Sequence, residues 1–306
     1  MDDAERLLPA CATIRQMRVD DWLPRRPRLR PGLRVVRRDN RHLQVGLDPG
    51  ARLVLPDDED SRRLIADLAG RRHPALVSES AHRRCRELVE RGFVVDADAL
   101  DQALRSPLPR DSVLASFADS GPRATHRLAA RAAARVAVVS SGQWQPAVVR
   151  AMASAGLSAA ESAGRPTAHL VVDPEAELLD RLMRRSQPHL VVSEVAGQIT
   201  VGPFVSPGLT ACSRCITAHR CDRDPGYATV REQYSTAVDE RVPPDPVLLQ
   251  LAAAWAVRDL VSYVEGDLPA TWSSTVAVDA GLTLVRQRWL RHPACGCSWG
   301  DALAAG

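Results

Sequence analysis

Four cysteines in the last third of the chain stand in two close pairs, a pattern typical of metal binding. Cys212 and Cys215 form a Cys-x-x-Cys motif, and Cys295 and Cys297 follow much later in the chain. Two such pairs can complete a tetrahedron of thiolates around Zn²⁺, and a site closed by four protein ligands is structural rather than catalytic. The second pair has one intervening residue where two are usual. We therefore predict a structural zinc ion bound by Cys212, Cys215, Cys295 and Cys297.

The cysteine pattern leaves alternatives open. A redox pair or a disulfide would use the same residues, and His219 or Cys221 could replace one of the four ligands because both lie beside the first pair. A nucleophilic Cys221 activated by His219 is a further alternative, although catalytic pairs meet in space and not through adjacency in sequence. Cys11 and Cys85 are predicted to be small apolar side chains.

Length and composition indicate a cytoplasmic protein of two domains. The chain has 306 residues, of which 45% are hydrophobic, enough for a sizeable core. Its first residues lack the features of a signal peptide, and seven cysteines without such a signal fit a reducing compartment. The longest apolar stretch, 247–263, is interrupted by Arg258 and Asp259. It is short for a membrane span and predicts a buried helix.

The charged residues exclude some chemistry. The formal net charge is +3, which does not demand a nucleic-acid partner, and the chain contains no lysine. Without lysine, neither a Walker-type phosphate site nor a Schiff-base mechanism is possible. The cationic side chains are arginines, which suit the recognition of carboxylates.

Residues 1–96 are predicted to form a small winged-helix-like domain with a basic N-terminal arm. Short hydrophobic runs separated by turn residues predict three strands, and capped amphipathic patterns predict two helices followed by a further strand. The strands are expected at 33–37, 42–47, 51–55 and 93–95, and the helices at 60–69 and 80–90. Residues 97–134 are polar, alanine-rich and contain three prolines, so we expect a linker there.

Residues 135–306 are predicted to form an α/β domain. Apolar strands alternate with helices, a pattern that indicates a parallel sheet with helical crossovers. The strands are expected at 135–140, 169–172 and 189–193, and the helices at 146–155 and 174–185.

One block of sequence resembles a known family. Residues 202–215 read Gly-Pro-Phe-Val-Ser-Pro-Gly-Leu-Thr-Ala-Cys-Ser-Arg-Cys, and 292–297 read His-Pro-Ala-Cys-Gly-Cys. With Arg220 and the 223–225 segment, they resemble ThiF-like proteins, related to ubiquitin-activating enzymes, of azole-containing peptide (bacteriocin) biosynthesis. Residues 45–50 and the helices after them resemble the peptide-recognition element of that family. The resemblance implies a winged-helix-like peptide-recognition domain preceding a Rossmann-like ThiF-type domain with structural zinc.

The chain departs from the family where ATP would bind. Adenylating relatives have a glycine-rich turn after the first strand, which lets the backbone approach phosphate. Here the turn at 140–145 contains only Gly142, and Trp144 and Gln145 are expected to add bulk. The following stretch, 157–167, is too short for the usual ribose and phosphate ligands, and its only cation is Arg165. We therefore expect a degenerate ThiF-type domain that does not bind ATP.

The resemblance also implies a function. Such a protein binds the leader of a precursor peptide and presents the peptide to a YcaO-type partner, which performs ATP-dependent cyclodehydration of Cys, Ser or Thr. The leader is expected to add to a strand edge and to contact the helix beside it. The residues expected to bind it are Leu53, Val54, Leu55, Arg84, Cys85 and Leu88.

Two other functions remain open at this stage. The protein could be an atypical adenylyltransferase, or a regulatory protein that binds DNA through Arg83, Arg84, Arg86 and the basic N-terminal arm. Glu79, Glu87 and Glu90 share or flank the same helix, which argues against DNA. A peptide is favoured over DNA chiefly because of the family resemblance. A homodimer is also compatible with the sequence.

Overall fold

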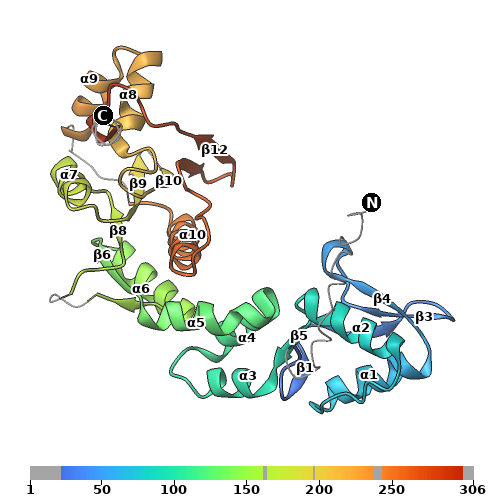
Figure 1. Cartoon of the computed structure of the whole chain (residues 1–306). Helices are drawn as coiled ribbons and strands as arrows, with labels where there is room; N and C mark the ends of the chain where they lie inside the picture. The colour runs from blue at the N-terminus through green and yellow to red at the C-terminus, as the bar shows by residue number, and fades with distance from the viewer. Residues whose placement is uncertain (1–21, 161–163, 196, 237–242, 299–306) are drawn as a thin grey trace, which may run out of the picture. The chain divides into compact units, whose positions relative to one another are not determined.

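The chain divides into two compact units. The computed structural model describes residues 22–160, 164–195, 197–236 and 243–298 (Figure 1). Unit 1 contains the described residues up to Gln102 together with 117–122, and unit 2 contains 103–116 and the described residues from Arg123 onward. Cys11 and most of the basic N-terminal arm lie outside the described residues.

Unit 1 combines two small sheets with two capped helices. Strands β2, β3 and β4 form an antiparallel sheet in that order, and β1 pairs with β5. Asp58 begins the first helix by accepting a hydrogen bond from the Ser61 amide, and Ser78 begins the second by accepting one from Ala81. The elements are β1 Pro27–Leu29, β2 Val35–Arg37, β3 His42–Val45, β4 Leu53–Pro56, α1 Glu59–Ala69, α2 Glu79–Glu90 and β5 Val94–Asp96.

The core of unit 1 follows from the two periodicities of its elements. Alternation along β4 buries Leu53 and Leu55 and exposes Val54. Helical spacing turns one stripe of α1 and one of α2 toward the same cluster. The cluster contains Leu23, Val45, Leu53, Leu55, Leu64, Leu68, Cys85, Leu88, Phe93 and Val94.

The expected linker at 97–134 is mostly helical. It contains α3 (Ala97–Leu104), α4 (Arg110–Ser120) and α5 (Ala124–Ala133). Alanine and leucine favour helix, and the three prolines lie outside the α-helices, with Pro122 in a short 3₁₀ helix, Gly121–Arg123. The division between the two units runs through α4.

Unit 2 is built on a mixed seven-stranded sheet. The strand order is β12-β11-β10-β9-β8-β6-β7, with β7, β6, β8 and β9 parallel and the other pairs antiparallel. This arrangement confirms the predicted α/β class and the parallel half of the sheet. The strands are β6 Arg135–Val139, β7 Ser158–Ala159, β8 Ala168–Val172, β9 His189–Val195, β10 Gln198–Val205, β11 Ser274–Val278 and β12 Leu284–Arg288. The helices are α6 Trp144–Ala155, α7 Ala176–Arg184, α8 Ser213–Arg223, α9 Tyr227–Thr236 and α10 Pro246–Val264.

Helices cover both faces of this sheet. Alternate residues of β8 and β9, such as Leu170 and Leu190, pack with α6 and α10 in the main core. Their neighbours Val171 and Val191 pack against Leu182 of α7 on the other face. Continuous apolar strands are expected where both faces of a sheet are covered.

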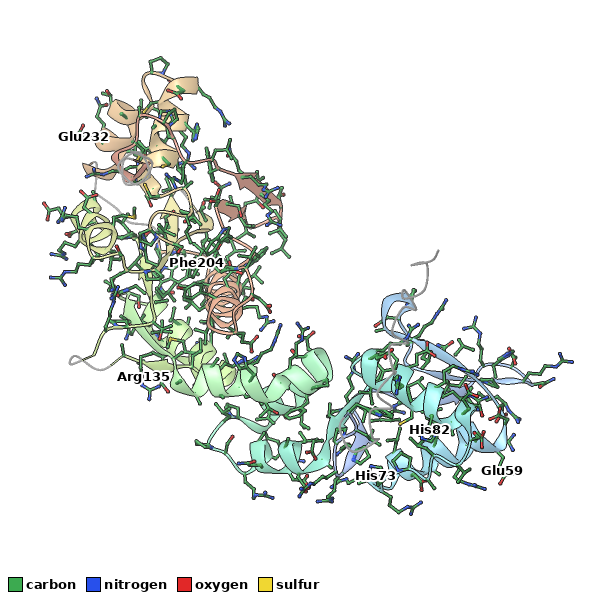
Figure 2. All side chains as sticks on the ribbon, in the orientation of Figure 1. Glu59, His73, His82, Arg135, Phe204 and Glu232 are labelled. Carbon is green, nitrogen blue, oxygen red and sulfur yellow. The ribbon has the colours of Figure 1, made fainter. Side chains whose placement is uncertain are left out.

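Helix α10 is the central helix of unit 2. By length and composition it is long and apolar enough to cross a membrane, but half of the relevant stretch is buried within the protein. It packs on α6 and on β10, whose Phe204 is labelled in Figure 2. Its buried Asp259 carboxylate accepts hydrogen bonds from the amides of Ala270 and Thr271. The prediction of a buried core helix is therefore confirmed.

The Gly-Pro-Phe segment of the family-like block lies where β10 bends. The β9–β10 register shifts between Val201 and Phe204, and Gly202 has φ +99°. A Cβ at Gly202 would lie 2.4 Å from the Ser274 carbonyl oxygen, so only glycine fits. The bend leads the chain from the sheet toward the first cysteine pair.

Candidate metal centre and peptide-binding edge

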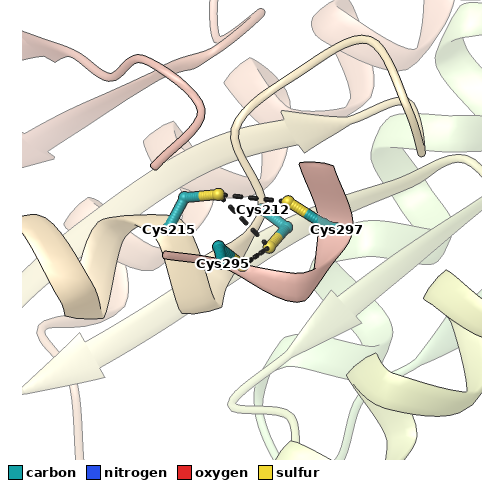
Figure 3. A group of neighbouring side chains, drawn as sticks. All are labelled: Cys212, Cys215, Cys295 and Cys297. Carbon is teal, nitrogen blue, oxygen red and sulfur yellow. Dashed lines mark hydrogen bonds between the residues drawn. The ribbon is translucent and has the colours of Figure 1, made fainter. Parts of the chain in front are cut away.

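The four cysteines predicted from the sequence meet in one cluster. The Sγ atom of Cys212 lies 3.7 Å from those of Cys215 and Cys295, and the Sγ atoms of Cys215 and Cys297 are 3.3 Å apart. All four sulfurs lie within 4.8 Å of one another (Figure 3). The cluster joins two segments far apart in the chain.

Local structure explains how each pair is positioned. Cys212 is the N-cap of α8 and Cys215 lies in its first turn, so both sulfurs project to the same side. Cys295 and Cys297 lie in the tight segment after β12, which ends in a short 3₁₀ helix at Gly296–Ser298. That 3₁₀ helix allows Cys295 and Cys297 to approach the same cluster although only Gly296 separates them. Val205, Ile216 and Trp289 pack around the sulfurs and shield them from water.

The protonation pattern of the cluster fits a site built for a cation. The Cys212 thiol donates to Cys215 and lowers the pKa of Cys215 to about 4. The same hydrogen bond, followed by burial, raises the pKa of Cys212. Burial, followed by the bond to Cys215, raises the pKa of Cys297 to about 12. Without a cation the cluster therefore favours one thiolate, and a dication would offset the repulsion between several.

The sulfur spacing also fits the size of a metal tetrahedron. A tetrahedral ion with metal–sulfur bonds of about 2.3 Å has sulfur–sulfur edges of about 3.8 Å. The sulfur–sulfur separations of 3.3 and 3.7 Å in the cluster are close to this value. The four cysteines could therefore hold a metal ion with little rearrangement.

The neighbouring histidines form a separate group. His219, Asp222 and His292 also offer ligand atoms within 4.8 Å of one another, but they do not join the cysteine group. His292 Nδ1 accepts from the Ala294 amide, so its Nε2 carries the proton and donates to Asp222 at 2.8 Å. His219 Nε2 contacts the Leu290 carbonyl oxygen at 3.0 Å. This group thereby attaches the C-terminal segment to α8 through hydrogen bonds.

Most of the predicted peptide-binding side chains lie in the core. Cys85 and Leu88 are fully buried, and burial raises the pKa of Cys85 to about 12. Leu53 and Leu55 are also buried, so of the six predicted residues only Val54 has a well-exposed side chain. The expectation that Cys85 and Leu88 line a binding surface is wrong, because their stripe of α2 faces the cluster beneath the sheet.

Arg84 is also placed differently from the expectation of an exposed cation. It is 9% exposed and makes two hydrogen bonds to Asp58, the residue that caps α1 after β4. Glu87 lies one turn further along α2, and Arg91 is the residue that caps its C-terminus. Arg91 donates to the Arg52 carbonyl oxygen at 3.2 Å. Helix α2 therefore runs beside β4, contacting it just after its end and just before its start.

Backbone alternation along β4 identifies which N–H and C=O groups point away from β3. The Asp57 amide donates to the Arg41 carbonyl, so Leu53 and Leu55 also point their backbone groups toward β3. Val54 and Pro56 point theirs away, and among the described residues β4 pairs with no strand except β3. Val54 thus presents a free N–H and C=O, whereas Pro56 has no N–H. Glu87 and Arg91 follow Arg84 at helical spacing, and the sequence analysis did not name either of them as a candidate for peptide binding.

The segment that replaces a phosphate-binding turn is open. Gly142 has φ +54°, and a Cβ there would meet no atom within 4 Å. Trp144 is 6% exposed and belongs to the main core, so the expectation that it fills the phosphate space is wrong. Gln145 instead bonds the Ser140 hydroxyl at 2.6 Å. Part of the expected nucleotide segment, 161–163, lies outside the described residues.

The fold of this chain, with its mixed seven-stranded sheet, is similar to that of solved heterocyclases, and its cysteine cluster could hold a metal ion. No family model matches the sequence, and no curated protein matches it.

Solved structures supply the comparison. The chain superposes on the heterocyclase TruD with TM-score 0.68 and 17% identity, covering 90% of this chain and 43% of that one. A heterocyclase in complex with substrate and cofactor gives TM-score 0.66 and 17% identity, covering 89% and 39%. Escherichia coli MccB with ATP gives 0.61 and 13%, covering 89% and 99%. The chain thus spans about two fifths of the heterocyclases and nearly all of MccB, and the likeness concerns the fold.

Proposed function

We propose that this protein is a non-catalytic leader-peptide-binding protein of ribosomal peptide modification, which presents a precursor peptide to a YcaO-type cyclodehydratase. The observation that carries the proposal is the outer edge of β4, which no other described strand pairs with, and α2 running beside it. An extended peptide can pair with such an edge through its backbone, while side chains on the adjacent helix select among sequences. The fold similarity to heterocyclases and MccB supports peptide modification as the general role.

The contacts around β4 support one arrangement of the leader. It would pair with Val54, the residue whose backbone groups point away from β3. Its side chains would meet Glu87 and Arg91 on α2, which are the partly or fully exposed members of the stripe that follows Arg84. Arg91 is already paired with Glu87 at 3.1 Å, so an acidic leader residue would compete for its guanidinium.

Zinc is the metal that best suits the cysteine cluster. Four thiolates at tetrahedral spacing favour Zn²⁺, and a closed set of protein ligands leaves no position for substrate. In this role the four cysteines hold the segment after β12 against the start of α8 and need no catalytic function.

The proposal is tested with the leader of a precursor encoded beside the gene. The labelled leader is titrated with the full chain and followed by fluorescence anisotropy, with a scrambled leader as the control. Specific recognition predicts at least tenfold weaker binding of the scrambled sequence. Equal binding of both sequences would refute the proposal, and tight, salt-sensitive binding of duplex DNA would favour a regulatory role instead.

A further inference from the structure

The seven-stranded sheet of unit 2 ends in an edge strand that carries exposed apolar side chains and arginines. Strand β12 is the terminal strand of the unit 2 sheet, beside β11 (Figure 1). Leu284 and Val285 on this strand are 54% and 55% exposed. Apolar edge strands that pair with nothing invite strand addition, and proteins normally shorten or cover them. The described residues provide no cover for this one.

The backbone groups that face outward can be identified. The Trp289 amide donates to the Ser273 carbonyl at 2.8 Å. Every second residue counted back from Trp289 therefore directs its backbone groups to β11. By alternation, Gln287 and Val285 also face β11, whereas Leu284, Arg286 and Arg288 turn their N–H and C=O groups to the free edge. The edge therefore offers three consecutive docking positions, where β4 offers one.

A depression lies at the end of the same strand. It has a volume of about 570 Å³ and is lined by Leu209, Ser273, Arg288, Trp289, Leu290 and Arg291. Leu209 and Leu290 are 70% and 80% exposed. Trp289 is only 3% exposed, and its indole N–H donates to the Thr275 hydroxyl. Trp289 also packs in the cluster around the cysteines, so the floor is fixed in position.

The charge of this surface is positive, because Arg288 and Arg291 line the depression and two further arginines contact its Trp289. Arg220 and Arg223 both stack on the Trp289 ring, with guanidinium carbons 5.6 and 5.7 Å from its centroid. Among the described residues, no carboxylate pairs with Arg220, Arg223 or Arg288. The nearby acids are engaged elsewhere. Asp222 pairs with His292, and Asp224 accepts from the Gly226 amide.

We propose that the β12 edge and the Trp289 depression dock an acidic, extended polypeptide segment of a partner protein. Such a segment would add to the sheet beside β12, place apolar side chains against Leu209 and Leu290, and direct carboxylates to the arginines. A second copy of this chain fits poorly, because antiparallel pairing of two β12 strands brings arginines opposite arginines or close to them. This surface lies on unit 2, and its occupancy does not depend on leader binding at β4.

The test uses a probe peptide of defined chemistry with the full zinc-loaded chain. A fluorescein-labelled peptide of about eight alternating glutamate and valine residues matches the strand period. Anisotropy should show saturable binding, at least tenfold tighter than for the lysine–valine peptide. N-methylation of alternate amides on the probe blocks backbone pairing and should also weaken binding tenfold or more. Equal binding of the methylated probe would overturn strand addition.

Variants of the chain locate the site. Arg286→Pro removes an outward N–H without touching the bonds to β11, and Arg286→Ala is its matched control because both lose the same side chain. Binding should be at least fivefold weaker for the proline variant. Arg288→Glu should weaken binding tenfold, whereas Arg83→Glu on α2, with the same change in net charge, should not. Equal effects of Arg288→Glu and Arg83→Glu, or a dimer in light scattering that Arg286→Pro dissociates, would overturn the proposal.

Discussion

The Arg84 guanidinium holds the Asp58 carboxylate through two hydrogen bonds of 2.6 and 2.8 Å. Asp58 also caps α1 by accepting from the Ser61 amide. One bidentate pair therefore joins the end of β4, the start of α1 and the middle of α2. The arrangement lowers the pKa of Asp58, chiefly through the hydrogen bond from Arg84.

Replacement of Arg84 should destabilise unit 1. Arg84→Ala leaves Asp58 without its main partner and should lower the free energy of unfolding by about 1–3 kcal/mol, measured by urea denaturation. Arg84→Lys should recover only part of the loss because lysine cannot make the bidentate contact. Arg83→Ala, an exposed neighbour on the same helix, is the control and should change stability little. An effect of Arg84→Ala no larger than that of the control would contradict this interpretation.

Leader binding should depend on the backbone of Val54 rather than on Leu88. Val54→Pro removes the outward N–H and should weaken the leader about tenfold, the value of one hydrogen bond, relative to Val54→Ala. Leu88→Asp places a carboxylate in the core and should cost about 4 kcal/mol or more, so it reports on folding. Anisotropy with circular dichroism separates the two effects. Equal leader affinity of the Val54 proline and alanine variants would exclude pairing at β4.

Metal content and stability should fall together when a cysteine of the cluster is replaced. Elemental analysis of the purified chain should give one zinc per molecule, and Cys215→Ser should lower this value. A loss of about 2 kcal/mol would lower the Tm by roughly 4–8 °C for a domain of this size. Cys221→Ser is the matched control, since Cys221 lies on the same helix outside the cluster. Metal-free protein prepared without chelator would contradict the zinc assignment.

Acid should destabilise unit 2 through His189. Burial lowers the pKa of this imidazole from 6.5 to about 4, and its Nδ1 contacts the Gln187 carbonyl oxygen. His189 binds a proton more readily in the unfolded chain than in the folded one. The stability that the neutral imidazole contributes is therefore complete above about pH 6.5 and is lost as the pH falls toward 4. The loss should reach about 3 kcal/mol at most.

The experiment compares wild type with His189→Asn in urea unfolding at several pH values. Asparagine retains a side-chain N–H for the Gln187 carbonyl but has no proton to gain in this range. Acid release of metal affects both proteins, so the difference between their curves isolates His189. Parallel curves between pH 4 and 6.5 would refute its role.

The chain should not bind ATP productively. The turn at Gly142 has one glycine where a phosphate-binding turn has several, and the chain has no lysine to contact phosphate. Calorimetry with magnesium-ATP should therefore detect no binding at micromolar concentrations. Micromolar binding that Gly142→Trp abolishes would contradict the proposal of a non-catalytic protein. Gly197→Trp is a suitable control because Gly197 is also left-handed and open.

The sequence by itself was sufficient for much of the local structure and for the membership of the cysteine cluster. The cysteine spacing identified all four members of the cluster, because a Cys-x-x-Cys motif at a helix start and a second close pair are local patterns. The apolar strands β6, β8 and β9 and the capped helices α1 and α2 were also predicted, since periodicity and capping act over a few residues. The three helices within 97–134 were not predicted, because the prolines and polar residues of that segment resemble those of a linker.

Only the tertiary structure decided which side chains are available for binding. Cys85 and Leu88 have the residue types of an apolar binding surface, yet they face the core because α2 packs with that stripe inward. Trp144 likewise follows the turn at Gly142 but is buried with α10. The free edges of β4 and β12 depend on strand order, which long-range pairing determines. Hydrophobic patterning specifies that a residue is buried or paired, whereas the partner that buries or pairs it is set by the fold.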